Sequence, residues 1–148
     1  MARKVYIVGT LHNPEVVKIG AAIRAAGHSV FDDWHCAGPE ADRYWQEYEQ
    51  ERGRSWVEAL QAAAALHNFR FDLEWLNWAD AVVLVLPAER DAHLEFGWVA
   101  RAAKVSVIYA PEDPEKWSLM SLLATHIVRD VDGIVAALEE EDQCLTFR

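Results

Sequence analysis

An acidic residue near the start of a predicted helix is the first candidate for chemistry in this sequence. Glu95 lies in the stretch Ala81–Ala102, which reads AVVLVLPAERDAHLEFGWVARA. The apolar run Ala81–Leu86 predicts a buried strand, and a helical pattern begins near Asp91. Open α/β sheets bind ligands at the carboxyl ends of such strands. Glu95 is therefore either a surface acid placed favourably against a helix N-terminus, or a nucleophile or base in a ligand site.

Three further polar residues flank Glu95 in the sequence. Asp72 lies on the predicted helix before that strand, in NFRFDLEWLNWAD, and is either a solvated helix acid or a second site carboxylate. Asp91 is either an N-cap or first-turn acid of the next helix or a site residue. His93 and Glu95 point to different sides of a helix because they are two residues apart, so they need not act as a pair.

A second candidate group follows the predicted strand His28–Phe31. Asp32 and Asp33 end that strand, where an acid can hold a sugar hydroxyl in nucleotide-binding α/β folds. Trp34 and His35 could stack on a base or hydrogen-bond to it. Each of these residues has the alternative of an ordinary surface or packing role.

Apolar and helical patterns alternate along the chain. The expected strands are Lys4–Val8, His28–Phe31, Ala81–Leu86, Val105–Tyr109 and His126–Val128. The expected helices are Pro14–Ala26, Arg54–Leu76 (which could break near His67–Asn68), Asp91–Ala102, Trp117–Leu123 and Val131–Glu139. This alternation predicts an α/β fold with one doubly wound, five-stranded parallel sheet, flavodoxin-like or Rossmann-like, in the order 2-1-3-4-5. In that order the turns 9–13 and 89–95 converge.

One segment interrupts this pattern. Residues 36–56 are polar and charged with interspersed aromatic rings, and we interpret them as a partly helical insertion that could form a lid over the site. The length of 148 residues favours a single domain over 1–148. The acidic tail from Glu140 is expected to be frayed.

Composition excludes several classes of function. A formal net charge of −10 is unlike that of proteins that grip nucleic-acid phosphates. No apolar run reaches the roughly 18 residues that a membrane span needs. Cys36 and Cys144 have no CxxC spacing, and the six histidines show no metal motif such as HExxH. We therefore expect a cytoplasmic protein with no metal, no nucleic-acid partner and no membrane partner.

Three stretches resemble the nucleoside 2-deoxyribosyltransferase-like superfamily, which includes nucleotide N-glycosidases. They are KVYIVG, FDLEWLNWADAVVLVLP and DAHLEFGWVARAAKVSVIY, and WSLMSLLATHIV is a weaker match to a segment that reaches a neighbouring subunit's site in related enzymes. The resemblance covers most of the chain apart from residues 36–56. It implies a small-molecule nucleoside or nucleotide as substrate, no cofactor, and a homo-oligomer, dimeric or higher.

The resemblance also implies residue roles. Glu95 falls where the family has its nucleophilic glutamate, and Asp72 falls where it has the aspartate that helps to hold the sugar. Tyr6 and Gly9 match the first strand and turn, which line the sugar pocket. Asp91 is near the family's second aspartate or serine. His93 is a departure, because family members often have glycine there.

The expected activity is cleavage or transfer of the N-glycosidic bond of a (deoxy)nucleoside or nucleotide. A carboxylate below the anomeric carbon can stabilise an oxocarbenium-like transition state or attack it, as in retaining glycosidases. A second acid with a raised pKa can protonate the leaving base. The alternative is a non-catalytic nucleotide-binding sensor or interaction module of the same fold, which the aromatic insertion and the His93 turn favour.

Overall fold

Five short apolar segments form one parallel sheet in the order β2-β1-β3-β4-β5. The fold comes from a computed structural model, which describes residues 1–140. The strands are β1 (Lys4–Val8), β2 (Ser29–Phe31), β3 (Ala81–Val85), β4 (Val105–Tyr109) and β5 (His126–Val128). Every neighbouring pair is parallel. The predicted strand order is confirmed, and the fold is flavodoxin-like.

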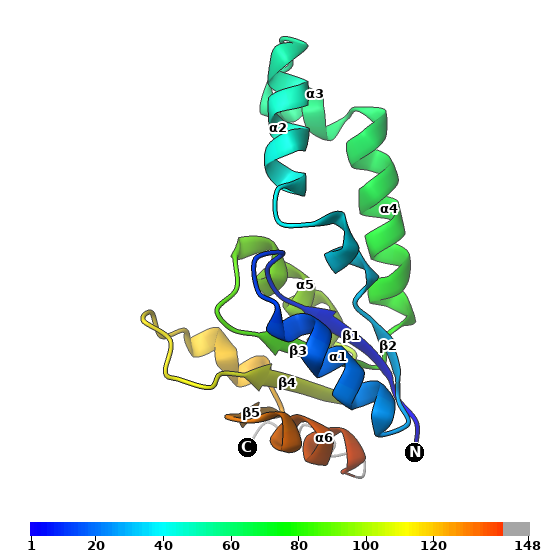
Figure 1. Ribbon diagram of the computed structural model, residues 1–148, viewed down its shortest axis with the longest axis vertical. Coiled ribbons are helices and arrows are strands. Elements are labelled where there is room, and N and C mark those ends of the chain that lie inside the picture. The colour runs from blue at the N-terminus through cyan, green and yellow to red at the C-terminus, as the bar shows by residue number, and fades with distance from the viewer. Residues whose placement is uncertain (141–148) are drawn as a thin grey trace.

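Helices cover both faces of the sheet (Figure 1). Helices α1 (Glu15–Ala25) and α6 (Val131–Glu139) pack on one face, and α4 (Ala63–Trp78) and α5 (Arg90–Ala100) pack on the other. Side chains alternate between these faces along each strand, as the pleat requires. In β1, for example, Val5 and Ile7 join the α1 face, whereas Tyr6 and Val8 join the α5 face.

Polar side chains accept hydrogen bonds at the starts of α1 and α6, and a glycine follows the end of α1. Asn13 Oδ1 accepts a hydrogen bond from the Glu15 backbone N–H at 3.0 Å, so Asn13 satisfies the N–H of the first residue of α1, whose N-cap position is Pro14. Gly27 follows that helix with a φ of +92°, a conformation that favours glycine. Asp130 Oδ1 accepts from the Gly133 N–H at 2.7 Å and caps α6.

The first part of the chain between β2 and β3 projects away from the sheet, and α4 then leads back to it (Figure 1). The connection forms the 3-10 helix η1 (Asp33–Ala37), then α2 (Ala41–Glu51), α3 (Trp56–Leu60) and α4. Figure 1 shows α2, α3 and the first half of α4 projecting beyond the strand ends. We call α2, α3 and residues 63–70 the arm. The insertion predicted over 36–56 therefore supplies α2 and the start of α3.

The predicted long helix breaks at a different place from the one we considered. His67–Asn68 lie inside α4, and the break falls at Gln61–Ala62, where Ala62 has an extended backbone. Helix α3 begins at a capping box in which the side chains of Ser55 and Glu58 each accept from the other residue's N–H. No residue type at 61–62 explains the break.

The last described residues add a 3-10 helix and a contact between the side chains of His126 and Glu140. The segment expected to be helical over Trp117–Leu123 is a 3-10 helix, η2, over Leu119–Leu123. Glu140 Oε2 lies 3.0 Å from His126 Nε2. The rest of the tail that we expected to be frayed, and Cys144, lie outside the described residues. Within residues 1–140 no helix is long and apolar enough to span a bilayer.

Candidate functional site

Glu95 lies on the face of α5 that meets the sheet. It is mostly buried, and it is the sixth residue of the helix. Burial raises the pKa of Glu95 to about 8, and the negative charges of Asp72 and Asp91 add to this rise. A carboxyl with such a pKa holds its proton near neutral pH and loses it under mildly basic conditions. This property is typical of functional sites, although structural burial can produce it too.

Tyr6 and Asp72 complete a group of three ionisable side chains. Tyr6 lies in β1, is fully buried, and packs on Phe31 at 5.1 Å between ring centroids. Burial raises the pKa of Tyr6, as do the charges of Glu95 and Asp72. Burial also raises the pKa of Asp72 on α4. The structure therefore brings together one side chain each from β1, α4 and α5.

An aromatic cluster forms the wall beside Tyr6. Phe31 and Trp75 stack with ring planes 7° apart and centroids 4.5 Å apart, and Phe71 meets both rings at its edge. The spacing of Phe71 and Trp75, four residues apart on a helix, was a sequence signal for this cluster that our site prediction did not use. Such rings are suited to packing against a flat base or a sugar face.

The turns after β1 and β3 meet at the mouth of this site, as the strand order predicts. Thr10 Oγ1 lies 3.5 Å from Glu89 Oε1. Glu89, Arg90 and Asp91 line an open hollow of about 480 Å³. His93 is exposed, and its Nδ1 lies 2.8 Å from the Glu89 carbonyl oxygen, so a protonated Nδ1 donates to it. His93 thus connects the first turn of α5 to the residue that precedes the helix.

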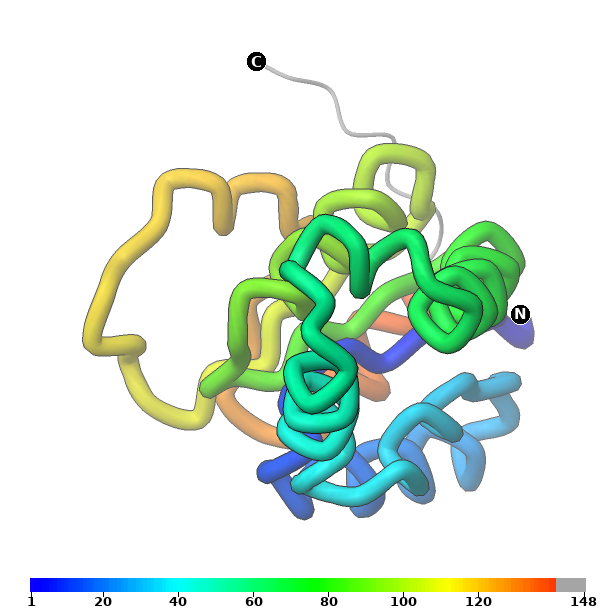
Figure 2. The backbone as a smooth tube through the Cα atoms, turned by 90° about the horizontal axis from the view of Figure 1, so that it is seen from above, coloured from blue at the N-terminus to red at the C-terminus, as the bar shows by residue number. Residues whose placement is uncertain are grey.

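Asp42, which sequence reasoning did not consider, lies near the converging turns. Asp42 lies in the first turn of α2. Its pKa is raised by partial burial and by the charges of Asp91 and Glu89, and His12 offsets part of this rise. The start of the arm therefore lies over the converging turns (Figure 2). No local sequence pattern could reveal the position of Asp42, because that position depends on where the chain after β2 places the start of α2.

The residues after β2 occupy a neighbouring position. Asp32 is buried and pairs with Arg24 through both carboxylate oxygens, so its charge is already engaged. The Trp34 indole N–H donates to the Ile7 carbonyl oxygen at 2.8 Å, which fixes its ring beside β1. Asp33 is exposed at the start of η1. Asp33 and Trp34 remain predicted binding residues at the rim.

Gly9 and Gly97 differ in their surroundings. A Cβ at Gly9 would lie 3.2 Å from Val16 Cγ2, so this glycine allows β1 and α1 to approach closely on the face opposite Tyr6. A Cβ at Gly97 would meet nothing within 4 Å. No close neighbour within residues 1–140 therefore requires the glycine inside α5.

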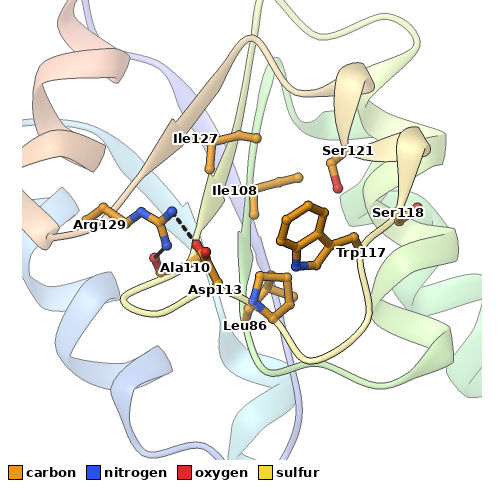
Figure 3. Close-up of a pocket in the computed structure, with 10 residues that line it drawn as sticks. Leu86, Ile108, Ala110, Asp113, Trp117, Ser118, Ser121, Ile127 and Arg129 are labelled. Carbon is orange, nitrogen blue, oxygen red and sulfur yellow. Dashed lines mark hydrogen bonds and ion pairs between the residues drawn. The ribbon is translucent and has the colours of Figure 1, made fainter.

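A second hollow lies at the carboxyl ends of β3, β4 and β5. It has a volume of about 290 Å³, and Figure 3 shows the Trp117 ring facing Ile108 across it. Arg129 closes another side, with Nη2 2.6 Å from Asp113 Oδ1.

Across the described part of the chain, no three His, Cys, Asp or Glu side chains are arranged to hold a metal ion.

The fold has a counterpart among solved structures. It is similar to that of a 2-deoxyribosyltransferase from the psychrotolerant bacterium Bacillus psychrosaccharolyticus, with a TM-score of 0.59 and 19% sequence identity. The similarity covers 88% of this chain and 89% of that chain. No family model and no curated protein matches the sequence. The chain thus has a nucleoside 2-deoxyribosyltransferase-like fold.

Proposed function

We propose that this protein cleaves or transfers the N-glycosidic bond of a (deoxy)nucleoside or nucleotide, with Glu95 as nucleophile. The observation that carries the proposal is the mostly buried carboxyl of Glu95 beside Asp72 and Tyr6, where strands β1 and β3 end. The likeness of the fold to a 2-deoxyribosyltransferase supports the class of reaction.

In the first step the ionised Glu95 carboxylate attacks the anomeric carbon. The carbon–nitrogen bond breaks, and the base leaves with its electron pair and takes up a proton. Asp72 is suited to supply that proton, because it lies close enough to Glu95 for its charge to act on that residue, and burial raises its pKa. In the second step a water molecule or an acceptor base attacks the same carbon, releases Glu95 and returns a proton to Asp72.

Tyr6 and the arm have supporting roles in this proposal. The raised pKa of Tyr6 keeps it a neutral phenol, which can donate a hydrogen bond within the carboxylate group. The start of α2, with Asp42, lies over the turns at the mouth and acts as the lid predicted for residues 36–56. Gly9, Asp33, Trp34, Asp91 and His93 are proposed to line the sugar and base positions.

The test is release of free base from a panel of nucleosides and their 5′-monophosphates, with ribose and with deoxyribose. We expect Glu95→Gln to lower the rate by at least about 10³-fold. Glu74→Gln is the matched control, because Glu74 is exposed two residues from Asp72 on the same helix. Adding a second base distinguishes transfer from hydrolysis. No base release or exchange with any member of the panel would refute the enzyme proposal.

The alternative function is nucleotide binding without turnover. The observation that favours it is His93, which stands where the resemblance expects glycine and whose Nδ1 lies 2.8 Å from the Glu89 carbonyl oxygen at the start of α5. Calorimetry that shows binding of a nucleoside or nucleotide, together with no base release over the same panel, would select this alternative.

A further inference from the structure

The start of α5 carries two carboxylates at the mouth of the proposed site. Glu89 precedes the helix, and Asp91 is its second residue. Together with Arg90 they line the open hollow of about 480 Å³. Thr10 Oγ1, on the turn after β1, lies 3.5 Å from Glu89 Oε1 and donates to it. The chain therefore holds its own carboxylates at a helix N-terminus, the place where phosphates bind in many proteins.

A third carboxylate lies near this hollow. Asp42 is in the first turn of α2, and its pKa is raised by burial and by the charges of Asp91 and Glu89. With Arg90 as the cation that lines the hollow, and with histidine counted as neutral, the net charge of the group is 1 − 3 = −2. Such a group opposes the entry of a phosphate dianion, because like charges a few ångströms apart repel even in water.

The proposed reaction determines which end of a nucleoside points toward this hollow. Asp91 precedes Glu95 by four residues, so the two share a face of α5 and Asp91 lies one turn nearer to the helix N-terminus. Asp72, which protonates the leaving base in that reaction, lies on α4 with the aromatic rings of Phe71 and Trp75. With the anomeric carbon at Glu95 and the base toward α4, the 5′ carbon of the sugar is directed toward the start of α5.

We infer that Glu89, with Asp42 and Asp91 beside it, is a specificity-determining residue that excludes a phosphate at the 5′ position. The site then takes uncharged nucleosides and rejects nucleoside 5′-monophosphates. This inference rests on the proposed function for the orientation of the sugar. A 5′ hydroxyl can donate a hydrogen bond to one of these carboxylates, whereas a fully ionised phosphate has no proton to donate and is repelled.

Arg90 is the residue that favours the opposite specificity. A guanidinium binds phosphate through two parallel hydrogen bonds, and Arg90 is exposed at the hollow. One positive charge does not balance three carboxylates and a phosphate dianion together. If Arg90 nevertheless held a phosphate, the monophosphate would be the better substrate and Arg90→Ala would abolish that preference.

The test compares each nucleoside of the panel with its own 5′-monophosphate. At pH 8 and low ionic strength we expect kcat/KM for the nucleoside to be at least about 100-fold higher. Glu89→Gln/Asp42→Asn should reduce this ratio by at least about 10-fold. The matched control is Glu74→Gln/Glu139→Gln, which removes two exposed carboxylates from α4 and α6 and should leave the ratio unchanged. In the unmodified protein, salt at about 0.5 M should also reduce the ratio, because it screens the carboxylates.

Calorimetry keeps the test decisive if no base is released. No turnover of either ligand refutes the proposed reaction, but binding still measures whether the phosphate is excluded. We then expect the nucleoside to bind at least about 100-fold more tightly than its monophosphate. Equal or better use of the monophosphate, in turnover or in binding, overturns the inference. A preference that neither salt nor Glu89→Gln/Asp42→Asn changes overturns it too, as does the absence of binding by both ligands.

Discussion

At the scale of single residues, the site depends on how far burial changes the acidity of one carboxyl. Glu95 lies on α5. Its burial, together with the charges of Asp72 and Asp91, raises its pKa to about 8. The position of Glu95 after the third strand was predictable from the sequence. The size of the pKa change was not, because it depends on neighbours distant in the chain.

The first prediction concerns the pH dependence of the reaction. Because the proposed reaction needs Glu95 ionised and Asp72 protonated, kcat/KM should rise and then fall with pH, with one of its two midpoints near 8. The measurement is kcat/KM for whichever substrate releases base, from pH 3 to 10. A profile with no midpoint near 8 would show that the ionisation of Glu95 does not control the reaction.

The second prediction concerns stability. Because the folded-state pKa of Glu95 lies above its unfolded value of 4.5, the folded protein holds a proton that the unfolded chain releases between pH 4.5 and about 8. Stability therefore falls as pH rises through that window. Glu95→Gln should be about 1–3 kcal/mol more stable than the parent at pH 9 and nearly equal at pH 4.

Urea unfolding at the two pH values measures this difference. Glu74→Gln, an exposed change on α4, should show no such dependence on pH. A constant difference between Glu95→Gln and the parent at both values would mean that the carboxyl titrates alike in the folded and unfolded chains.

At the scale of elements, α1 is held to β2 by a contact that leaves no room for a side chain. A Cβ at Gly20 would lie 2.1 Å from Asp32 Oδ2, and Asp32 is fixed there by Arg24. Gly20 is therefore required for this helix to pack beside the end of β2. Sequence reasoning considered Asp32 as a ligand residue, whereas the structure shows its carboxylate engaged in this packing.

The third prediction compares two glycines in helices. Gly20→Ala should destabilise the protein by about 1–3 kcal/mol, because the new methyl group displaces Asp32 from Arg24. Gly97→Ala should stabilise it by up to about 1 kcal/mol, since the added methyl group meets nothing within 4 Å and alanine favours a helix. Thermal unfolding measures both, and equal effects would contradict the assigned packing.

The elements differ in how far the sequence predicts them. The strands were predictable because buried parallel strands are continuous runs such as Ala81–Val85, and right-handed crossovers then leave few possible strand orders. The convergence of Glu89 with Thr10 followed from that order. The arm was not predictable in detail, because its helices have weak core patterns and their directions are decided by contacts beyond the local sequence.

At the scale of the whole molecule, an open sheet domain carries a projecting pair of helices (Figure 1). The sheet is covered on both faces and needs no partner for its core. The arm exposes apolar faces and has a negatively charged segment at 40–62, in a protein whose net charge is −10. The sheet core is therefore complete within one chain, whereas the buried residue of α2 is the charged Glu49.

The fourth prediction concerns the homo-oligomer that the resemblance of the sequence implies. If folded copies of the chain associate, the melting temperature of the protein should rise with protein concentration, because association favours the folded state by mass action. Scanning calorimetry over a roughly 100-fold concentration range measures this effect, and a constant melting temperature would contradict it.

The central position of β1 has a consequence for how the chain folds during synthesis. Residues 4–8 are made before the other strands of the sheet, yet β1 lies between β2 and β3, so its second neighbour emerges from the ribosome only with residues 81–85. Until then Val5, Ile7 and Val8 lack the partners that bury them. The arm is translated in that interval, before the sheet can close. The nascent chain is therefore expected to be most vulnerable to aggregation and most dependent on chaperones before residue 85 leaves the exit tunnel.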